Sequence, residues 1–271
     1  MVPVNTGKIA SKASLSEAGL LTASEPSPIR TERLKGTSPF VFICDHASNR
    51  IPQSLGNLGL PESELSRHIA WDIGAASVTT KLSRRFNAAA IYQNYSRLVI
   101  DCNRRPEVFN SVPHISEETP IPGNVNLSVA DRQKRIDDIF TPYHDALGQI
   151  LDDRAEQNRE SILVSVHSFT PVFKGFQRPW DFALVYNRDP RLSRIMLELM
   201  KADGDLILGD NEPYFLSDET DYTLPVHGEQ RSLPHTQFEI RQDHIGTPGQ
   251  QSEWAERLGN GLERTRKIFS Q

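Results

Sequence analysis

Residues 40–46 read Phe40-Val41-Phe42-Ile43-Cys44-Asp45-His46. Residues 40–44 are apolar without a break, which is typical of a strand that is buried on both faces of a sheet. The run then turns polar at once and ends in a histidine. Ligands of open α/β sheets bind beyond the carboxyl ends of the strands. This stretch therefore predicts a buried strand with a functional site at its end.

The rest of the chain alternates short apolar runs with longer amphipathic stretches. We expect strands at residues 40–44, 88–93, 97–102, 161–166, 182–186 and 237–240, and helices at residues 62–86, 127–154, 192–202 and 248–269. The first helix is expected to break near Asp72 and Gly74, and Ser128 is expected to cap the second. Strands that alternate with helices predict a single-domain α/β three-layer sandwich, in which a mostly parallel or mixed sheet lies between helices on both faces.

Residues 1–36 differ from the rest of the chain. They are rich in Ser, Thr, Ala and Pro and show little apolar periodicity, so we expect an extended or partly ordered N-terminal segment. One catalytic domain is expected over residues 37–271, a length that is ordinary for an α/β domain.

The composition excludes several classes of protein. The 271 residues are 37% hydrophobic and 24% charged, which excludes a mainly disordered, collagen-like or coiled-coil chain. No apolar run approaches the roughly 18 residues that a membrane-spanning helix needs. The net charge of −5, without a long block of Lys and Arg, argues against nucleic acid as a partner.

The cysteines and the first residues of the chain bear on location. Cys44 and Cys102 each lie in an apolar run, and two buried thiols suit a reducing compartment. The first residues lack the basic and apolar regions of a secretory signal. We therefore expect a cytoplasmic protein.

Candidate metal ligands follow two of the predicted strands. His46 follows residues 40–44, and His167 follows residues 161–166. A catalytic zinc ion takes three protein ligands and keeps one position open, and Asp72 is the oxygen donor that we favour as the third. Asn49 is a rival, although a neutral amide is a poorer zinc ligand than a carboxylate. Each histidine taken alone also fits a structural role, and Asp72 also fits a helix N-cap.

Glu239 is a carboxylate inside the otherwise apolar strand of residues 237–240. A buried carboxylate needs a partner or an active site, so Glu239 is a candidate general base that activates water and then protonates the leaving nitrogen. The alternative is ordinary alternation on a half-exposed strand.

A polar segment follows the strand predicted at residues 97–102. Asn103 and Arg104, with Arg97, are candidates to bind a substrate carboxylate, because a guanidinium group matches a carboxylate with two hydrogen bonds. Asp101 is expected to orient Arg104 or a ligand. The alternative is a surface cluster of charges.

Two more histidines have settings that permit a role. His144 lies beside Tyr143 on the apolar side of the helix at residues 127–154, as a candidate substrate contact or as a core residue. His227 lies in a loop rich in Pro, Gly and Asp, where it either donates to a developing oxyanion or is a plain loop residue.

Five short motifs occur in order along the chain: Cys44-Asp45-His46-Ala47-Ser48-Asn49-Arg50-Ile51-Pro52, Tyr95-Ser96-Arg97-Leu98-Val99-Ile100-Asp101-Cys102-Asn103-Arg104, Pro142-Tyr143-His144, Val166-His167-Ser168-Phe169 and Phe238-Glu239-Ile240-Arg241-Gln242-Asp243. As a set they resemble the motifs of the N-formylglutamate amidohydrolase family, and more distantly those of zinc carboxypeptidases. The resemblance does not cover the first 36 residues.

The resemblance implies a fold like that of zinc carboxypeptidases and a role for each matching residue. It implies His46 and His167 as metal ligands, Asn103 and Arg104 as the carboxylate grip, and Glu239 as the general base. The loop at residues 211–227 is implied to help close the site. Carboxypeptidases place a glutamate three residues after the first histidine, where this chain has Asn49, so Asp72 is expected to be the third ligand.

These observations together predict a Zn²⁺-dependent hydrolase that cleaves the amide bond of a small N-acyl amino acid. By resemblance, the expected substrate is N-formyl-L-glutamate and the products are formate and L-glutamate. One alternative is a non-catalytic protein that binds a carboxylated ligand, because the expected glutamate is missing at position 49. Another is a deacylase or carboxypeptidase that acts on a different N-acyl amino acid or a small peptide. No feature of the sequence indicates the oligomeric state.

Overall fold

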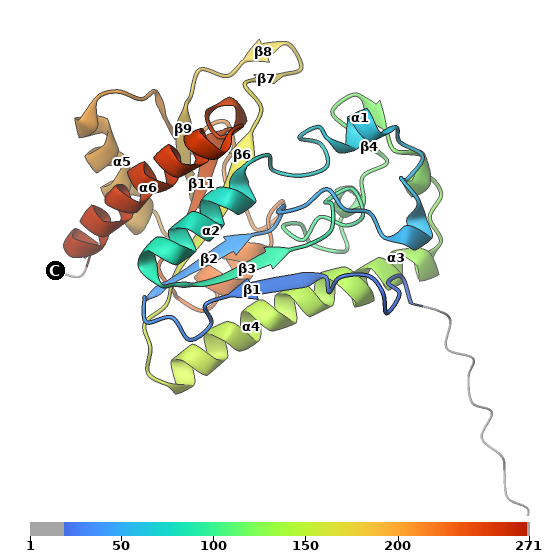
Figure 1. The fold of residues 1–271 in the computed structure, drawn as a ribbon, viewed down its shortest axis with the longest axis horizontal. Helices are drawn as coiled ribbons and strands as arrows, with labels where there is room; N and C mark the ends of the chain where they lie inside the picture. Colours follow the sequence, from blue (N-terminus) through green and yellow to red (C-terminus); the bar gives the residue numbers. More distant parts are fainter. Residues whose placement is uncertain (1–18, 270–271) are drawn as a thin grey trace, which may run out of the picture.

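The computed structural model describes residues 19–269 of the chain (Figure 1). Its strands are β1 Ile29–Glu32, β2 Phe40–Cys44, β3 Ala89–Gln93, β4 Ile115–Ser116, β5 Thr119–Pro120, β6 Ile162–Phe169, β7 Val172–Phe173, β8 Phe176–Gln177, β9 Phe182–Val185, β10 Leu208–Asp210 and β11 His235–Arg241. Its helices are α1 Glu62–Leu65, α2 Ala75–Phe86, α3 Val129–Arg135, α4 Thr141–Glu156, α5 Arg191–Asp203 and α6 Pro248–Phe269, with π-helical turns at Ile136–Phe140 and Pro225–Glu229.

A seven-stranded mixed sheet forms the middle layer, in the order β1-β3-β2-β6-β11-β9-β10. The neighbours β3, β2, β6 and β11 run parallel, whereas β1 and β9 pair antiparallel with β3 and β11. Two small hairpins, β4–β5 and β7–β8, stand outside this sheet. The predicted α/β class and mixed sheet are confirmed.

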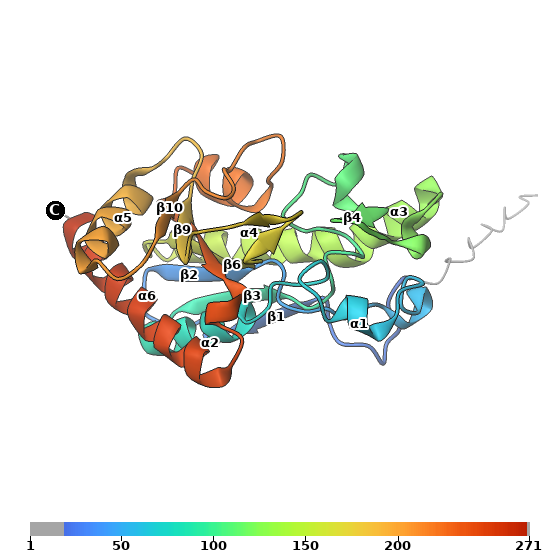
Figure 2. The same ribbon diagram turned by 90° about the horizontal axis from the view of Figure 1, so that it is seen from above.

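Helices cover both faces of the sheet (Figure 2). On one face, α2 packs against β2, and α5 and α6 complete the core cluster that contains Phe40, Phe42 and Cys44. On the other face, α4 and the segment around residue 98 belong to the core cluster that contains Val41 and Ile43 of the same strand. The unbroken apolar run of residues 40–44 thus reflects burial on both faces, since successive side chains of a strand point to opposite sides.

The helix predicted at residues 62–86 is two helices, α1 and α2, and the predicted break is confirmed. Gly74 stands directly before α2 with φ at 82°. A Cβ atom at this position would lie 2.3 Å from the carbonyl oxygen of Ile245, so only glycine fits here. The Ser128 cap is also confirmed, because its side chain accepts a hydrogen bond from the amide of Asp131 at 3.0 Å.

The strand predicted at residues 97–102 is wrong, because this segment is a series of turns. Leu98, Val99 and Ile100 are buried in the core, and this burial produced the apolar pattern. Side chains from other segments bind the carbonyl groups that a neighbouring strand would have bound: Asn124 donates to Leu98 O and Arg135 donates to Val99 O. An apolar run therefore indicated burial here, but not an extended ladder.

Other differences concern the ends of elements. His167 lies inside β6 instead of after it, because the strand continues to Phe169. In the predicted N-terminal segment, residues 29–32 form β1 at the edge of the sheet, and residues 1–18 lie outside the described part. Within residues 19–269, no helix combines the length and the apolar character that crossing a membrane requires.

Candidate active site

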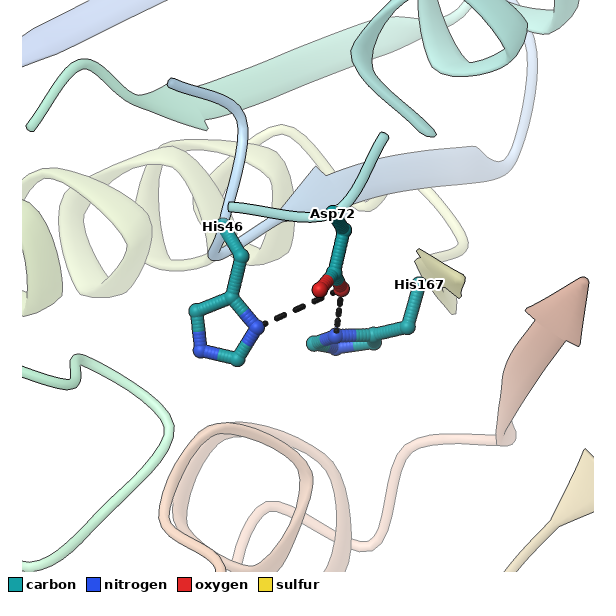
Figure 3. A group of neighbouring side chains, drawn as sticks. All are labelled: His46, Asp72 and His167. Atoms are coloured by element: carbon teal, nitrogen blue, oxygen red, sulfur yellow. Dashed lines mark hydrogen bonds and ion pairs between the residues drawn. The ribbon is translucent and has the colours of Figure 1, made fainter. Parts of the chain in front are cut away.

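Three buried side chains meet at the carboxyl end of the sheet (Figure 3). His46 follows β2, His167 belongs to β6, and Asp72 comes from the loop before α2. Asp72 Oδ2 lies 3.3 Å from His46 Nδ1 and 2.8 Å from His167 Nδ1, and one ligand atom from each residue lies within 4.8 Å of the others. Since β2 and β6 are parallel neighbours, their carboxyl ends bring the two histidines to the same place.

Each histidine of this cluster turns its other ring nitrogen to a buried carboxylate. His46 Nε2 lies 2.8 Å from Asp101 Oδ1, and His167 Nε2 lies 3.3 Å from Asp45 Oδ2. Ser165 Oγ, at 2.9 Å from His167 Nε2, is a further partner. Partners of this kind favour a proton on Nε2, which leaves the lone pair of Nδ1 for a metal ion.

We expect Asp45→Asn to weaken the binding of a divalent metal ion to this cluster by about 10–100-fold, with zinc as the test ion, which is the typical cost of losing such a partner. The amide nitrogen cannot accept a hydrogen bond from His167, although the remaining oxygen still accepts from Tyr143 and Thr223, as Asp45 Oδ1 does at 2.9 Å from each. Competition with a fluorescent chelator measures the zinc affinity. Thr223→Val is the control, because it removes one hydrogen bond to Asp45 but keeps the carboxylate. Equal zinc affinity of Asp45→Asn and the unmodified protein would contradict the expected role.

Glu239 lies on β11, opposite His167 in the parallel pairing of β11 with β6. Its Oε1 accepts a hydrogen bond from Gln237 Nε2 at 2.9 Å, and its Oε2 has no partner among the described residues. Burial raises the pKa of Glu239 to about 7, although the nearby His167 opposes this rise. A carboxylate with one free oxygen and a pKa near neutrality has the properties of a general base.

Arg104 and Asn103 line the same cavity as the histidines and Glu239, a space of about 320 Å³. Arg104 donates to Thr220 O at 2.7 Å and lies 3.7 Å from Asp101, and its side chain is one third exposed (33%). Asn103 holds a loop in place, because its Oδ1 accepts the amide of Thr223 at 3.1 Å. Arg104 is therefore the more available of the two for a ligand carboxylate.

Arg97 also lines this cavity, but its charge already has a partner. Its Nη2 lies 2.8 Å from Asp72 Oδ1 and donates to His68 O. The guanidinium group therefore positions Asp72, one of the three clustered side chains, as well as facing the cavity.

His144 and His227 do not line this cavity. They stack on each other, with 5.3 Å between ring centroids, and His144 Nδ1 lies 3.1 Å from His227 Nε2. His144 Nε2 donates to Cys102 O at 2.8 Å. From α4 it is Tyr143 that points toward the cluster, where its hydroxyl donates to Asp45. The geometry therefore gives no support to the predicted roles of the two histidines in substrate binding and catalysis.

Comparison with known proteins identifies the family. The model of the N-formylglutamate amidohydrolase family matches residues 38–246, a range that contains the cluster of His46, Asp72 and His167 as well as Arg104 and Glu239. This chain belongs to the N-formylglutamate amidohydrolase family. It is therefore an amidohydrolase. A sequence search of the curated proteins found no match.

The solved structures that resemble the chain include the following two. A gene product of Agrobacterium tumefaciens is 35% identical, with a TM-score of 0.90, and the match covers 93% of this chain and 100% of that one. N-formylglutamate amidohydrolase from Ralstonia eutropha JMP134 is 16% identical, with a TM-score of 0.67 and coverage of 90% and 99%. The second likeness shows a shared fold.

The clustered residues of this amidohydrolase fit a divalent metal ion. Two imidazole nitrogens and one carboxylate oxygen converge in a buried place that opens to a cavity, which is the ligand set of catalytic zinc sites with room for a further ligand. The carboxylates of Asp45 and Asp101 behind the rings complete the arrangement that such sites require. His46, Asp72 and His167 are therefore the residues that would hold the ion.

The sequence did not point to some residues in and behind the amidohydrolase cavity. Asp45 lies behind His167 and does not line the cavity, and its place next to His46 at the end of a predicted strand was a signal that could have indicated it. No sequence signal pointed to His68, which lines the cavity. Burial and the charge of Arg97 lower the pKa of His68 to about 3, so its ring is neutral. Residues 213–216 and 220–221, from the loop that the resemblance implicates in closing the site, also lie on the cavity wall.

Proposed function

We propose that this amidohydrolase uses a divalent metal ion, zinc in the first place, to cleave the amide bond of a small N-acyl amino acid. The proposed substrate is N-formyl-L-glutamate, which would give formate and L-glutamate. The observation that carries the proposal is a single cavity that combines the cluster of His46, Asp72 and His167 with Glu239 and Arg104. The two buried free thiols, Cys44 and Cys102, support the further proposal that the enzyme works in the cytoplasm.

In the proposed reaction, the residues of this cavity have separate roles. Zinc, when held by the cluster, supplies Lewis acidity that polarises an acyl oxygen and makes water a better nucleophile. Glu239 takes a proton from the attacking water through its free Oε2 and returns it to the leaving nitrogen. Arg104 binds the carboxylate of the amino acid and so fixes the distance of the amide from Glu239.

Release of the free amino acid by the zinc-loaded protein, with formate as the second product of N-formyl-L-glutamate, tests this function. N-acetyl- and N-succinyl-L-glutamate, N-formyl-L-methionine and a glutamyl dipeptide form the comparison panel. Highest kcat/KM on N-formyl-L-glutamate supports the proposal. Highest kcat/KM on another member assigns a different acyl group or a peptidase activity, and no hydrolysis of any member by protein with bound zinc contradicts the proposal.

Arg104→Met is expected to raise KM for N-formyl-L-glutamate by about 10–100-fold with a smaller change in kcat. Hydrogen bonds to charged groups contribute about 1.5–3 kcal/mol, and the grip acts on the ground state and the transition state alike. Steady-state kinetics measure the effect on two compounds, N-formyl-L-glutamate and its analogue in which a carboxamide replaces the α-carboxylate. An equal loss on both compounds would mean that Arg104 does not bind this carboxylate.

A further inference from the structure

Three arginines are deeply buried: Arg135, Arg154 and Arg178 are 1%, 2% and 6% exposed. No carboxylate among residues 19–269 forms an ion pair with any of them. Arg135 and Arg154 nevertheless have a clear structural role. Their guanidinium groups donate to carbonyl and side-chain oxygens of neighbouring segments at 2.7–2.9 Å, as described above for Val99 O.

The surroundings of Arg178 are different. Its Nη1 donates to Thr170, at 3.2 Å to Oγ1 and at 3.4 Å to the carbonyl oxygen, and its side chain also hydrogen-bonds with Tyr214. Otherwise the guanidinium group lies among aromatic rings, with centroids at 4.7 Å for Phe173, 4.9 Å for Tyr214 and 5.7 Å for Phe169. Aromatic faces stabilise a cation, but they do not use the paired donors of a guanidinium group. A buried cation without an anion is costly, so this setting favours an anionic ligand.

A second cavity of about 390 Å³ lies next to Arg178. It is bordered by Ile115 of β4 and by Phe173 of β7, the two hairpins that stand outside the main sheet (Figure 1). Thr170, Phe173 and Tyr214 all line it, and all three contact Arg178. The guanidinium group therefore lies one layer of side chains behind the wall of this cavity.

The second cavity continues the one that holds the metal cluster. The residues that line both are His68, Arg97, Asp101, Arg104 and Tyr214. A ligand bound through Arg104 therefore stands at the junction, with its amide in the first cavity and room for a further group in the second.

The charges around the two cavities indicate the chemistry of the ligand group that would occupy the second cavity. Arg97 pairs closely with Asp72, at 2.8 Å, whereas Arg104 lies 3.7 Å from Asp101, so Arg104 is the cation of the shared wall that is more available to a carboxylate. Glu117 lies on the wall of the second cavity, but Arg67 neutralises it at 2.7 Å. A substrate with two carboxylates needs a second cation, and Arg178 lies beside the cavity without an acidic partner among the described residues.

We propose that Arg178 forms a second carboxylate subsite, which binds the side-chain carboxylate of a dicarboxylic N-acyl amino acid while Arg104 binds its α-carboxylate. Tyr214 separates the guanidinium group from the cavity, and its side chain is the one that moves aside or shares the bond to the carboxylate. The choice of N-formylglutamate as the test ligand rests on the proposed function. The subsite itself rests on the burial and surroundings of Arg178.

Two substrates that differ only at the side-chain end, N-formyl-L-glutamate and N-formyl-L-glutamine, test the proposal. In Arg178→Met, the ratio of kcat/KM for the glutamate compound to that for the glutamine compound is expected to fall by about 10–100-fold relative to the unmodified enzyme, mainly through KM. Arg178→Lys, which keeps the charge, restores part of this ratio. Arg104→Met is the matched control, since it acts on the α-carboxylate that both substrates carry and leaves the ratio in place.

An unchanged ratio in Arg178→Met overturns the proposal, whether both activities fall together or neither falls. Thermal unfolding of each variant checks the fold, and Arg178→Lys carries the test if Arg178→Met does not fold. Calorimetric binding of L-glutamate and L-glutamine to the zinc-loaded protein separates this proposal from the proposed function. A loss of glutamate affinity alone in the variant supports the subsite even if N-formylglutamate is not hydrolysed, and equal affinity of the unmodified protein for the two amino acids overturns it.

Discussion

Glu239→Gln is expected to lower kcat for N-formyl-L-glutamate by about 10²–10⁴-fold, the usual contribution of a general base, while zinc stays bound. Glutamine keeps the shape of the side chain and can still pair with Gln237, but it cannot take a proton from water. The three residues of the metal cluster are untouched by the change. Formate release and zinc content, measured on the same preparation, check both parts of this expectation.

A matched control for this variant is Glu229→Gln. Glu229 is also a buried carboxylate, with 5% of its side chain exposed, but it pairs with Arg188 and lines neither of the two cavities described above. An equal loss of kcat in both variants would show that loss of a buried charge, and not loss of a base, causes the effect. A Glu239→Gln enzyme with unchanged kcat would rule out Glu239 as the base.

The pH dependence gives a second readout for the same residue. The base must be ionised, so kcat/KM is expected to fall as the pH decreases through the pKa of Glu239, which is about 7. A bound cation favours the carboxylate form, so the inflection in the zinc-loaded enzyme is expected at or below this value. Glu239→Gln should lack the inflection, and its persistence in this variant would assign it to another group.

His167→Ala is expected to abolish tight zinc binding and with it all measurable hydrolysis. The substitution removes one of three ligands, and it also leaves the buried carboxylates of Asp45 and Asp72 without the ring that lies between them. Removing one partner of a buried charged pair typically costs about 3–5 kcal/mol, so the apparent stability is expected to fall as well. Metal analysis after dialysis, thermal unfolding and formate release measure the three effects.

His114→Ala is the control for this variant. Its ring contacts Phe109 outside the metal cavity, with 4.6 Å between ring centroids. Zinc content and activity should match those of the unmodified protein. Full activity of His167→Ala, or activity of the unmodified protein that survives complete removal of metal by a chelator and is not raised by zinc, would contradict a catalytic metal.

The parts of the fold that the sequence predicted well are those in which one local pattern has one structural meaning. Residues 40–44 are apolar throughout because β2 is buried on both faces, and Ser128 and Gly74 mark helix ends through local geometry. Residues 97–102 show the limit of this reasoning. Their apolar side chains are equally buried, but the carbonyl groups bind distant side chains, and a local pattern does not reveal such partners.

The same distinction applies to the candidate site, where local patterns indicated some residues and not others. Strand ends and short motifs were enough to nominate His46, His167 and Glu239, because parallel strands bring their carboxyl ends to one edge of the sheet. The choice of Asp72 as the third clustered residue also agrees with the structure. The helical position of His144 did not predict its surroundings, because periodicity tells which face of a helix is buried but not what packs against it.

The order of polar and apolar residues along the chain was thus sufficient for the α/β class, the mixed sheet and the edge at which chemistry is placed. The tertiary structure alone decided that His144 and His227 pair away from the cavity and that Asp45 stands behind His167. It also decided that Arg178 lies among aromatic rings beside a second cavity. The physical reason is that these relations join segments distant in sequence, and their geometry depends on how whole layers pack, which no local pattern encodes.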